Sequence, residues 1–163
     1  MQQATKDLLP KTEKHLEQLS NLLITELNNI LEGEWGLNKS TDIHKVELLD
    51  IEVFVDGYRL ALYPMDRRGT QLGYKSLLQG EYAEGLLNDE ELNPNLDLYD
   101  FTNEGDNREL YEFDQAQQEI FFTWFTACWN KTDNRKLTIP IYLQLHGSDE
   151  SFHLQANKWV KEK

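Results

Sequence analysis

The stretch that most constrains the fold runs from Phe113 to Asn130 and reads FDQAQQEIFFTWFTACWN. It contains two of the four tryptophans, four of the seven phenylalanines and the single cysteine of the chain. Its largest apolar side chains recur at the spacing of one helical face: Ile120, Phe121, Trp124, Phe125 and Cys128. Asp114 and Gln117 have the spacing of a capping box, which satisfies the free amides of a first helical turn. We therefore predict a buried aromatic helix over about 114–130; the alternative is an aromatic surface that faces a ligand or partner.

A second helix is predicted near the start of the chain, over about 10–32. Apolar residues recur there on one side at helical spacing: Leu16, Leu19, Leu23, Ile24, Leu27, Ile30 and Leu31. Pro10 suits the first turn of a helix, and Gly33 suits the position just past its end. We expect this stripe to cover one face of a sheet, and a dimerising coiled coil is the alternative.

The first of two predicted β-hairpins spans about 43–63 and turns at the dipeptide Asp56-Gly57. This dipeptide favours a two-residue type I′ turn, in which both central residues need positive φ. The turn sets a register that places apolar pairs on one face: Val53 with Leu60, and Ile51 with Leu62.

The second predicted hairpin spans about 137–159, with a loop at 147–150. Setting His146 opposite Ser151 also places apolar pairs on one face: Leu145 with Phe152, Leu143 with Leu154, and Ile141 with Ala156. Pro140 has no amide hydrogen, so its strand is expected to lie at a sheet edge or to be bulged. Two helices and two hairpins predict an α+β fold, in which an antiparallel sheet packs against both helices.

The charge of the chain is concentrated in one segment. At 163 residues the chain is expected to form a single domain over 1–163, with a net charge of -13. Residues 81–119 hold 13 acidic residues and one basic residue, a net charge of -12. Within them, 81–113 is predicted to be a long, acidic and partly irregular segment with brief strands at 96–101 and 109–113. Its tyrosines, leucines and Phe101 predict that it packs onto the domain, because disordered segments are poor in such residues.

Composition excludes several classes of function. Phosphate contacts require a basic patch, so nucleic-acid binding is not expected. Uncharged stretches such as 120–130 are far shorter than the roughly 20 residues of a membrane-spanning helix, and the first residues have no apolar signal region. A single cysteine rules out an internal disulfide framework, so a cytoplasmic protein is expected, with Cys128 in the core rather than acting as a nucleophile.

No pattern of metal ligands or catalytic residues is strong, and we predict neither a metal nor a cofactor. From Asp100 the sequence resembles a calcium-binding EF-hand loop, but Tyr111 stands where a bidentate glutamate is required. His146 and His153 are expected on the polar face of the last hairpin, where two imidazoles could share a metal or a proton; the alternative is two surface histidines. The enzyme hypothesis is therefore a carboxylate-rich, metal-dependent hydrolase or another small enzyme, and we expect a binding protein instead.

The acidic segment predicts a protein-interaction module that binds a basic partner, because a dense negative field speeds association with a positive surface. The candidate partner-binding residues are acids of this segment: Asp89, Glu90, Glu91, Asp97, Asp100, Glu104, Asp106, Glu109 and Glu112. In size, acidity and lack of catalytic motifs the chain resembles the general class of bacterial immunity and anti-nuclease proteins. That resemblance implies a nuclease-like or other toxin as the partner. The other alternative is a structural domain whose acidity serves only solubility.

Overall fold

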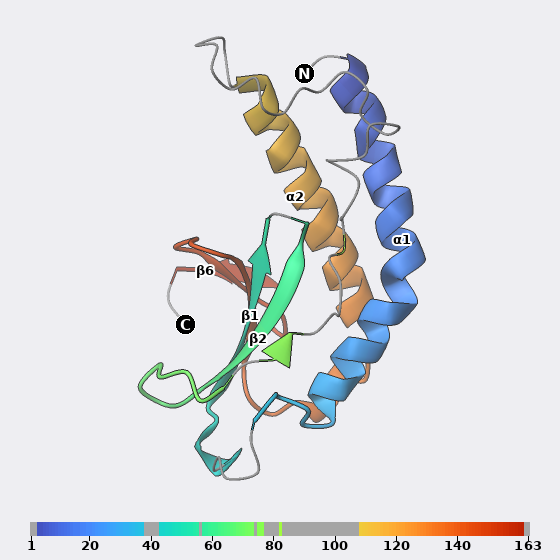
Figure 1. Cartoon of the computed structure of the whole chain (residues 1–163). Helices are drawn as coiled ribbons and strands as arrows, with labels where there is room; N and C mark the ends of the chain where they lie inside the picture. The colour runs from blue at the N-terminus through green and yellow to red at the C-terminus, as the bar shows by residue number, and fades with distance from the viewer. Residues whose placement is uncertain are drawn as a thin grey trace.

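The computed structural model describes residues 3–37, 43–55, 57–73, 75–76, 82 and 108–161. Two helices, α1 (Gln3–Leu31) and α2 (Arg108–Trp129), lie on one face of a six-stranded sheet (Figure 1). The sheet has the order β3-β2-β1-β4-β5-β6. Its strands are β1 (Leu48–Phe54), β2 (Arg59–Met65), β3 (Lys75–Ser76), β4 (Ile141–Leu145), β5 (Ser151–His153) and β6 (Lys158–Val160). Two short 3₁₀ turns, Ile43–Lys45 and Asn134–Lys136, precede β1 and β4. The predicted α+β fold is confirmed.

Both helices begin earlier than the sequence predicted. The helix α1 starts at Gln3 and carries Pro10 in its interior, and α2 starts at Arg108, so Asp114 lies inside the helix. The expected capping box at Asp114 is therefore wrong, and so is the expected strand at 109–113, which is helical. Gln117 is buried and its side chain reaches across to α1, where Nε2 donates to Thr12 Oγ1 at 3.0 Å.

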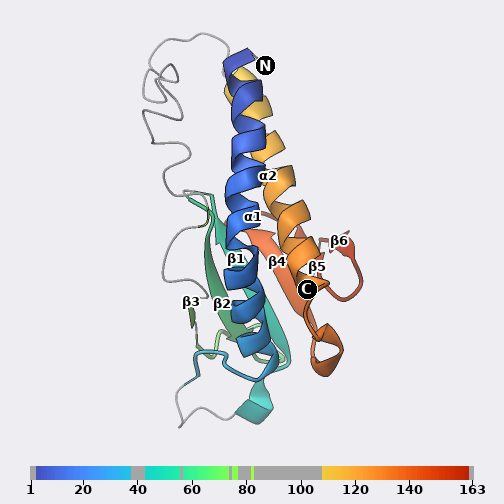
Figure 2. The same cartoon turned by 90° about the vertical axis from the view of Figure 1, so that its right-hand side faces the viewer.

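The two helices run side by side in the same direction, with α1 in front of the sheet in Figure 2. Hydrogen bonds between them follow the same order along both: Gln117 reaches Thr12, and further on Trp124 Nε1 donates to Ser20 Oγ at 2.9 Å. The leucine stripe of α1 faces the core as predicted, and four of its members are fully buried: Leu16, Leu23, Leu27 and Ile30. At the end of α1, Gly33 has a positive φ of 91°, which suits its predicted place just past the helix.

The register of the first hairpin is confirmed. Val53 pairs with Leu60 and Ile51 with Leu62, and all four side chains are fully buried beneath the helices. At the turn, Gly57 has φ of 106° and Tyr58 has φ of 53°, while Asp56 lies outside the described residues. The Tyr58 ring is buried and stacks on Phe121 of α2, with centroids 4.5 Å apart, so the tip of the hairpin packs on the aromatic helix.

The sheet is mixed, whereas a purely antiparallel sheet was expected. Strands β1 and β4 lie side by side and run parallel, with Ile51 opposite Leu143. Parallel strands need a long crossover connection, and α2 provides it by running back across the sheet before β4 begins. The two predicted hairpins are thereby joined edge to edge into one sheet.

The second hairpin differs from its predicted register by two residues. Leu143 pairs with Phe152, and the chain then turns again to add β6, in which Trp159 pairs with Phe152. A shift of two residues keeps every side chain on its predicted face, because side chains alternate with a period of two. Strand β4 begins only after Pro140, so it occupies the middle of the sheet without needing the missing amide hydrogen.

Candidate functional site

Most of the predicted partner-binding acids lie outside the described residues: Asp89, Glu90, Glu91, Asp97, Asp100, Glu104 and Asp106. Glu109 and Glu112 belong to the first turns of α2, where Glu112 is half-buried. Near the other end of the acidic segment, the Tyr82 ring is fully buried and meets Phe121 and Trp124 edge-on, with centroids 6.2 and 5.1 Å away. Burial raises the pKa of the Tyr82 hydroxyl well above its usual range. Tyr82, near the start of the acidic segment, therefore packs on α2, and the last residues of the segment belong to α2 itself.

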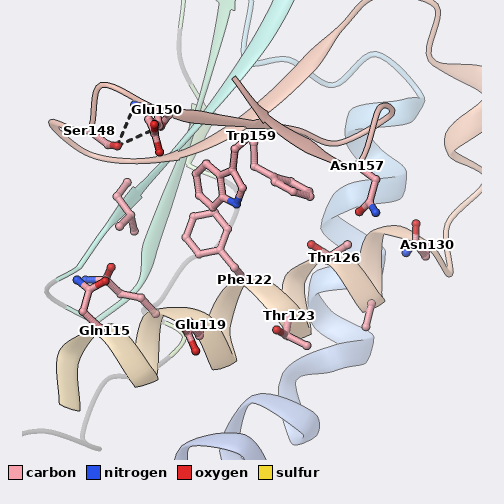
Figure 3. Close-up of a pocket in the computed structure, with 14 residues that line it drawn as sticks. Gln115, Glu119, Phe122, Thr123, Thr126, Asn130, Ser148, Glu150, Asn157 and Trp159 are labelled. Carbon is pink, nitrogen blue, oxygen red and sulfur yellow. Dashed lines mark hydrogen bonds between the residues drawn. The ribbon is translucent and has the colours of Figure 1, made fainter. Parts of the chain in front are cut away.

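A groove of about 970 Å³ lies between α2 and the β4–β6 part of the sheet (Figure 3). Such a volume is at the upper end of the roughly 300–1,000 Å³ typical of ligand sites. The groove is lined from α2 and the residue just past its end by Gln115, Gln118, Glu119, Phe122, Thr123, Thr126, Ala127 and Asn130, and from the sheet and its turns by Leu145, Ser148, Glu150, Phe152, Asn157 and Trp159. In the sequence, the acidic segment directly precedes α2, the helix that forms one side of the groove.

Three aromatic side chains, Trp159, Phe122 and Phe152, form a wall across the groove. The Trp159 ring packs on Phe122 of α2 with centroids 5.2 Å apart and on Phe152 of β5 with centroids 5.4 Å apart. Trp159 is nevertheless 49% exposed, which makes it one of the few large apolar side chains on the surface of the described residues. Its neighbours fix the ring on two sides, and the remaining area faces the groove (Figure 3).

The aromatic wall separates an acidic half of the groove from a neutral half. Gln115 and Glu119, in the first and middle parts of α2, lie across the groove from the β4–β5 turn that carries Ser148 and Glu150 (Figure 3). Toward the end of α2, the lining is made of neutral hydroxyl and amide side chains: Thr123, Thr126, Asn130 and Asn157. Among the described residues that line the groove there is no lysine or arginine.

One cation of the same chain approaches the acidic half from outside. Lys161 Nζ lies 4.0 Å from Glu150 Oε1, and both side chains are well exposed. An ion pair of this kind contributes little, roughly 0–1 kcal/mol, because water and salt screen it. A cation from another molecule can therefore replace Lys161 at low cost.

A second groove runs between the two helices and shares Glu119, Thr123 and Ala127 with the first. Two further acids, Glu13 and Glu17, line it from α1, and Cys128 lies at its floor with 1% exposure. Burial raises the pKa of the Cys128 thiol, although a hydrogen bond with Ser20 opposes this shift. Because thiolate is the reactive form, Cys128 is a core residue, in agreement with the sequence analysis.

On the opposite face of the sheet, polar side chains form a network around Gln144. Gln144 Nε2 lies 3.3 Å from Asp50 Oδ2 and 3.3 Å from Glu52 Oε1, and the Ser151 hydroxyl donates to Gln144 Oε1 at 2.9 Å. At the edge of this polar network, His146 Nδ1 lies 3.0 Å from Glu52 Oε2. A carboxylate at Nδ1 leaves Nε2 of a neutral imidazole as a proton acceptor, which is the arrangement of a general base.

The two histidines of the last hairpin are not close enough to share a metal or a proton. His153 pairs with Tyr142, four residues before His146 along the β4 direction, which separates the two positions by about 13 Å at roughly 3.3 Å per residue. His153 Nδ1 instead accepts a hydrogen bond from Ala156 N at 3.1 Å. Across the part of the chain that the structure describes, no three His, Cys, Asp or Glu side chains are grouped to hold a metal ion, and no helix is long and apolar enough to cross a membrane.

Sequence reasoning missed the groove residues Glu119, Glu150 and Trp159. These three residues line one groove because the β5–β6 turn brings β6 back beside α2. Local sequence patterns do not reveal this turn. The one available signal was Phe122, which lies off the apolar stripe of α2 and points to a second contact surface. Comparisons of the chain with models of protein families, with curated proteins and with solved structures found no match.

Proposed function

We propose that the chain is a small protein-interaction module that binds a basic partner protein, as an immunity or inhibitor protein does. The observation that carries the proposal is the groove beside α2, which is lined by a half-exposed Trp159 and by the carboxylates of Glu119 and Glu150. Aromatic side chains are enriched at protein interfaces, and flanking charge selects the partner. A groove with these features suits a cationic protein surface.

The charge distribution supports the same proposal. A net charge of -12 over residues 81–119 leads into the helix that forms the groove. Such a field raises the association rate with a positive partner and opposes association with a negative one. A nuclease-type toxin presents a positive surface because it must bind phosphate groups, so it is the partner class that this acidity fits best.

The test is the salt dependence of binding to an unstructured polycationic peptide of alternating lysine and glycine, followed by calorimetry. We expect the affinity to fall as ionic strength rises, and to fall at least about tenfold when Asp97, Asp100 and Asp106 are changed to lysine. The matched control changes the exposed Glu32, Glu47 and Asp133 to lysine, which alters the net charge equally at sites away from the proposed surface. Equal losses in the two variants would refute the proposal and leave acidity as an aid to solubility.

A hydrolase is the second candidate function, and the contact between His146 and Glu52 favours it. A histidine paired with a carboxylate contributes roughly 10²–10⁴-fold to a rate when it acts as a general base. Under this reading, His146→Asn abolishes hydrolysis of model phosphoesters or carboxylic esters, while thermal stability stays near that of the parent. An activity that survives this substitution would eliminate His146 as the base.

A further inference from the structure

We propose that the acidic half of the groove is a binding subsite for one arginine side chain, carried by an extended segment of the basic partner. This inference rests on the proposed function and adds the chemical identity of the group that is recognised. The subsite is formed by Glu150 on the β4–β5 turn, by Glu119 across the groove on α2, and by the exposed part of the Trp159 ring between them.

The charge of the subsite selects a cation. Glu119 and Glu150 are exposed and belong to different elements, and among the described lining residues no base neutralises them from within. Lys161, which approaches Glu150 to 4.0 Å from outside the lining, shows that this carboxylate is open to an ammonium or guanidinium group. An anionic ligand would instead be repelled by both carboxylates.

The aromatic wall favours arginine over lysine. A guanidinium is planar and weakly hydrated, so it can stack on an aromatic face while its edge donates two hydrogen bonds to a carboxylate. Tryptophan is the best aromatic partner for a cation. Contacts with Phe122 and Phe152 hold the Trp159 ring in place before any ligand arrives, so little conformational entropy is lost on binding.

The neutral half of the groove suits the peptide backbone beside that arginine. Thr126, Asn130 and Asn157 offer hydroxyl and amide groups that can both donate and accept hydrogen bonds. Backbone N–H and C=O groups need both kinds of partner when they leave water. The combined volume of about 970 Å³ admits an arginine side chain together with its neighbouring peptide units.

The test uses the full chain and three short glycine-serine peptides that differ at one residue, which is arginine, lysine or citrulline. Binding is followed through the indole N–H resonance of Trp159, identified by its loss in Trp159→Phe. We expect a saturable shift with the arginine peptide, binding weakened at least about fivefold with lysine, and no saturable binding with the uncharged citrulline. Equal affinity for all three peptides would overturn the inference.

Single substitutions locate the subsite. Glu119→Gln and Glu150→Gln should each weaken arginine-peptide binding at least about fivefold, whereas Glu13→Gln, an exposed glutamate on α1, should leave it unchanged. Lys161→Ala should strengthen binding by about twofold to fivefold, because it removes the competing ammonium group. These glutamines keep the size of the side chain, so a failure to fold is not an expected source of the loss. Affinity that is unchanged in both Glu119→Gln and Glu150→Gln would overturn the inference.

The outcomes separate this inference from the proposed function. If the lysine-glycine polycation binds through Asp97, Asp100 and Asp106 but the arginine peptide ignores Glu119 and Glu150, the interaction module stands and the arginine subsite fails. If the arginine peptide binds at Glu119 and Glu150 but the polycation shows no salt-dependent loss in the charge-reversed variant, the subsite stands and the wider acidic surface fails.

Discussion

The side-chain amide of Gln117 donates to the hydroxyl oxygen of Thr12 at 3.0 Å, inside the contact between α2 and α1. The Thr12 hydroxyl in turn donates to the Leu8 carbonyl at 3.2 Å, and both side chains are almost fully buried. A buried polar group that loses its partner costs about 1–3 kcal/mol, so this pair opposes sliding of one helix along the other. It fixes which residues of α2 face the groove.

Gln117→Leu should lower the free energy of unfolding by about 1–3 kcal/mol, because the Thr12 hydroxyl loses its donor in a buried setting. Gln117→Leu combined with Thr12→Val should cost less than the sum of the single substitutions, with a coupling of about 1 kcal/mol. Urea unfolding of the parent and the three variants measures this coupling. Strictly additive losses would show that the two side chains act independently.

Two tryptophans should respond very differently to truncation. Trp124 is 8% exposed and hydrogen-bonds to Ser20, so Trp124→Ala should destabilise the fold by about 3–5 kcal/mol. Trp159 is 49% exposed, so Trp159→Ala should stay within about 1 kcal/mol of the parent while it abolishes arginine binding. Thermal and urea unfolding measure both. If the two variants lose the same stability, Trp159 is a structural residue.

Tyr58 should tolerate glycine better than alanine. Its φ of 53° lies in the left-handed region, where an L-residue costs about 1–2 kcal/mol and glycine does not. Both substitutions remove the ring that stacks on Phe121, so their difference reports the backbone alone. We expect Tyr58→Gly to be more stable than Tyr58→Ala by about 1 kcal/mol in urea unfolding. The reverse order, which is usual elsewhere in a chain, would contradict the strained turn.

Asp66 should titrate below its usual pKa. Its Oδ1 accepts hydrogen bonds from the backbone N–H groups of Thr70 and Arg68, both at 2.8 Å, and these bonds lower the pKa of the carboxyl below 3.8. The stabilisation by this turn is therefore present above the ordinary pKa and is lost as the pH falls through the lowered value. A carboxyl NMR titration of the folded protein checks the midpoint. A midpoint at or above 3.8 would contradict the turn geometry.

The parts of the fold that follow from local patterns were predictable from sequence. Alternation of apolar residues around a two-residue turn gave the first hairpin, including the pairing of Val53 with Leu60. The leucine stripe of α1 and the aromatic stripe of α2 were predictable for the same reason, since a helix places every third or fourth residue on one face. The excess of acidic residues just before α2 can likewise be counted directly in the sequence.

The remaining features depend on tertiary contacts. Asp114 and Gln117 match a capping box in sequence, yet Gln117 satisfies its polar groups with a threonine 105 residues away in the chain. The parallel pairing of β1 with β4 depends on a crossover that no local pattern encodes. Trp159 belongs to the groove only because β6 folds back on β5, so its role could not be predicted from its place near the end of the sequence.

We propose that a basic partner binds on the acidic segment and the α2–β6 groove, and chemical-shift mapping of the bound chain would locate the contact. The isotopically labelled full chain is titrated with a polycationic peptide that contains both arginine and lysine. We predict that the perturbed resonances gather in 83–112 and at Glu119, Glu150 and Trp159, and that they return to their starting positions as salt is added. Perturbations spread evenly over the molecule, or centred on Glu52 and His146 of the opposite sheet face, would contradict the claim.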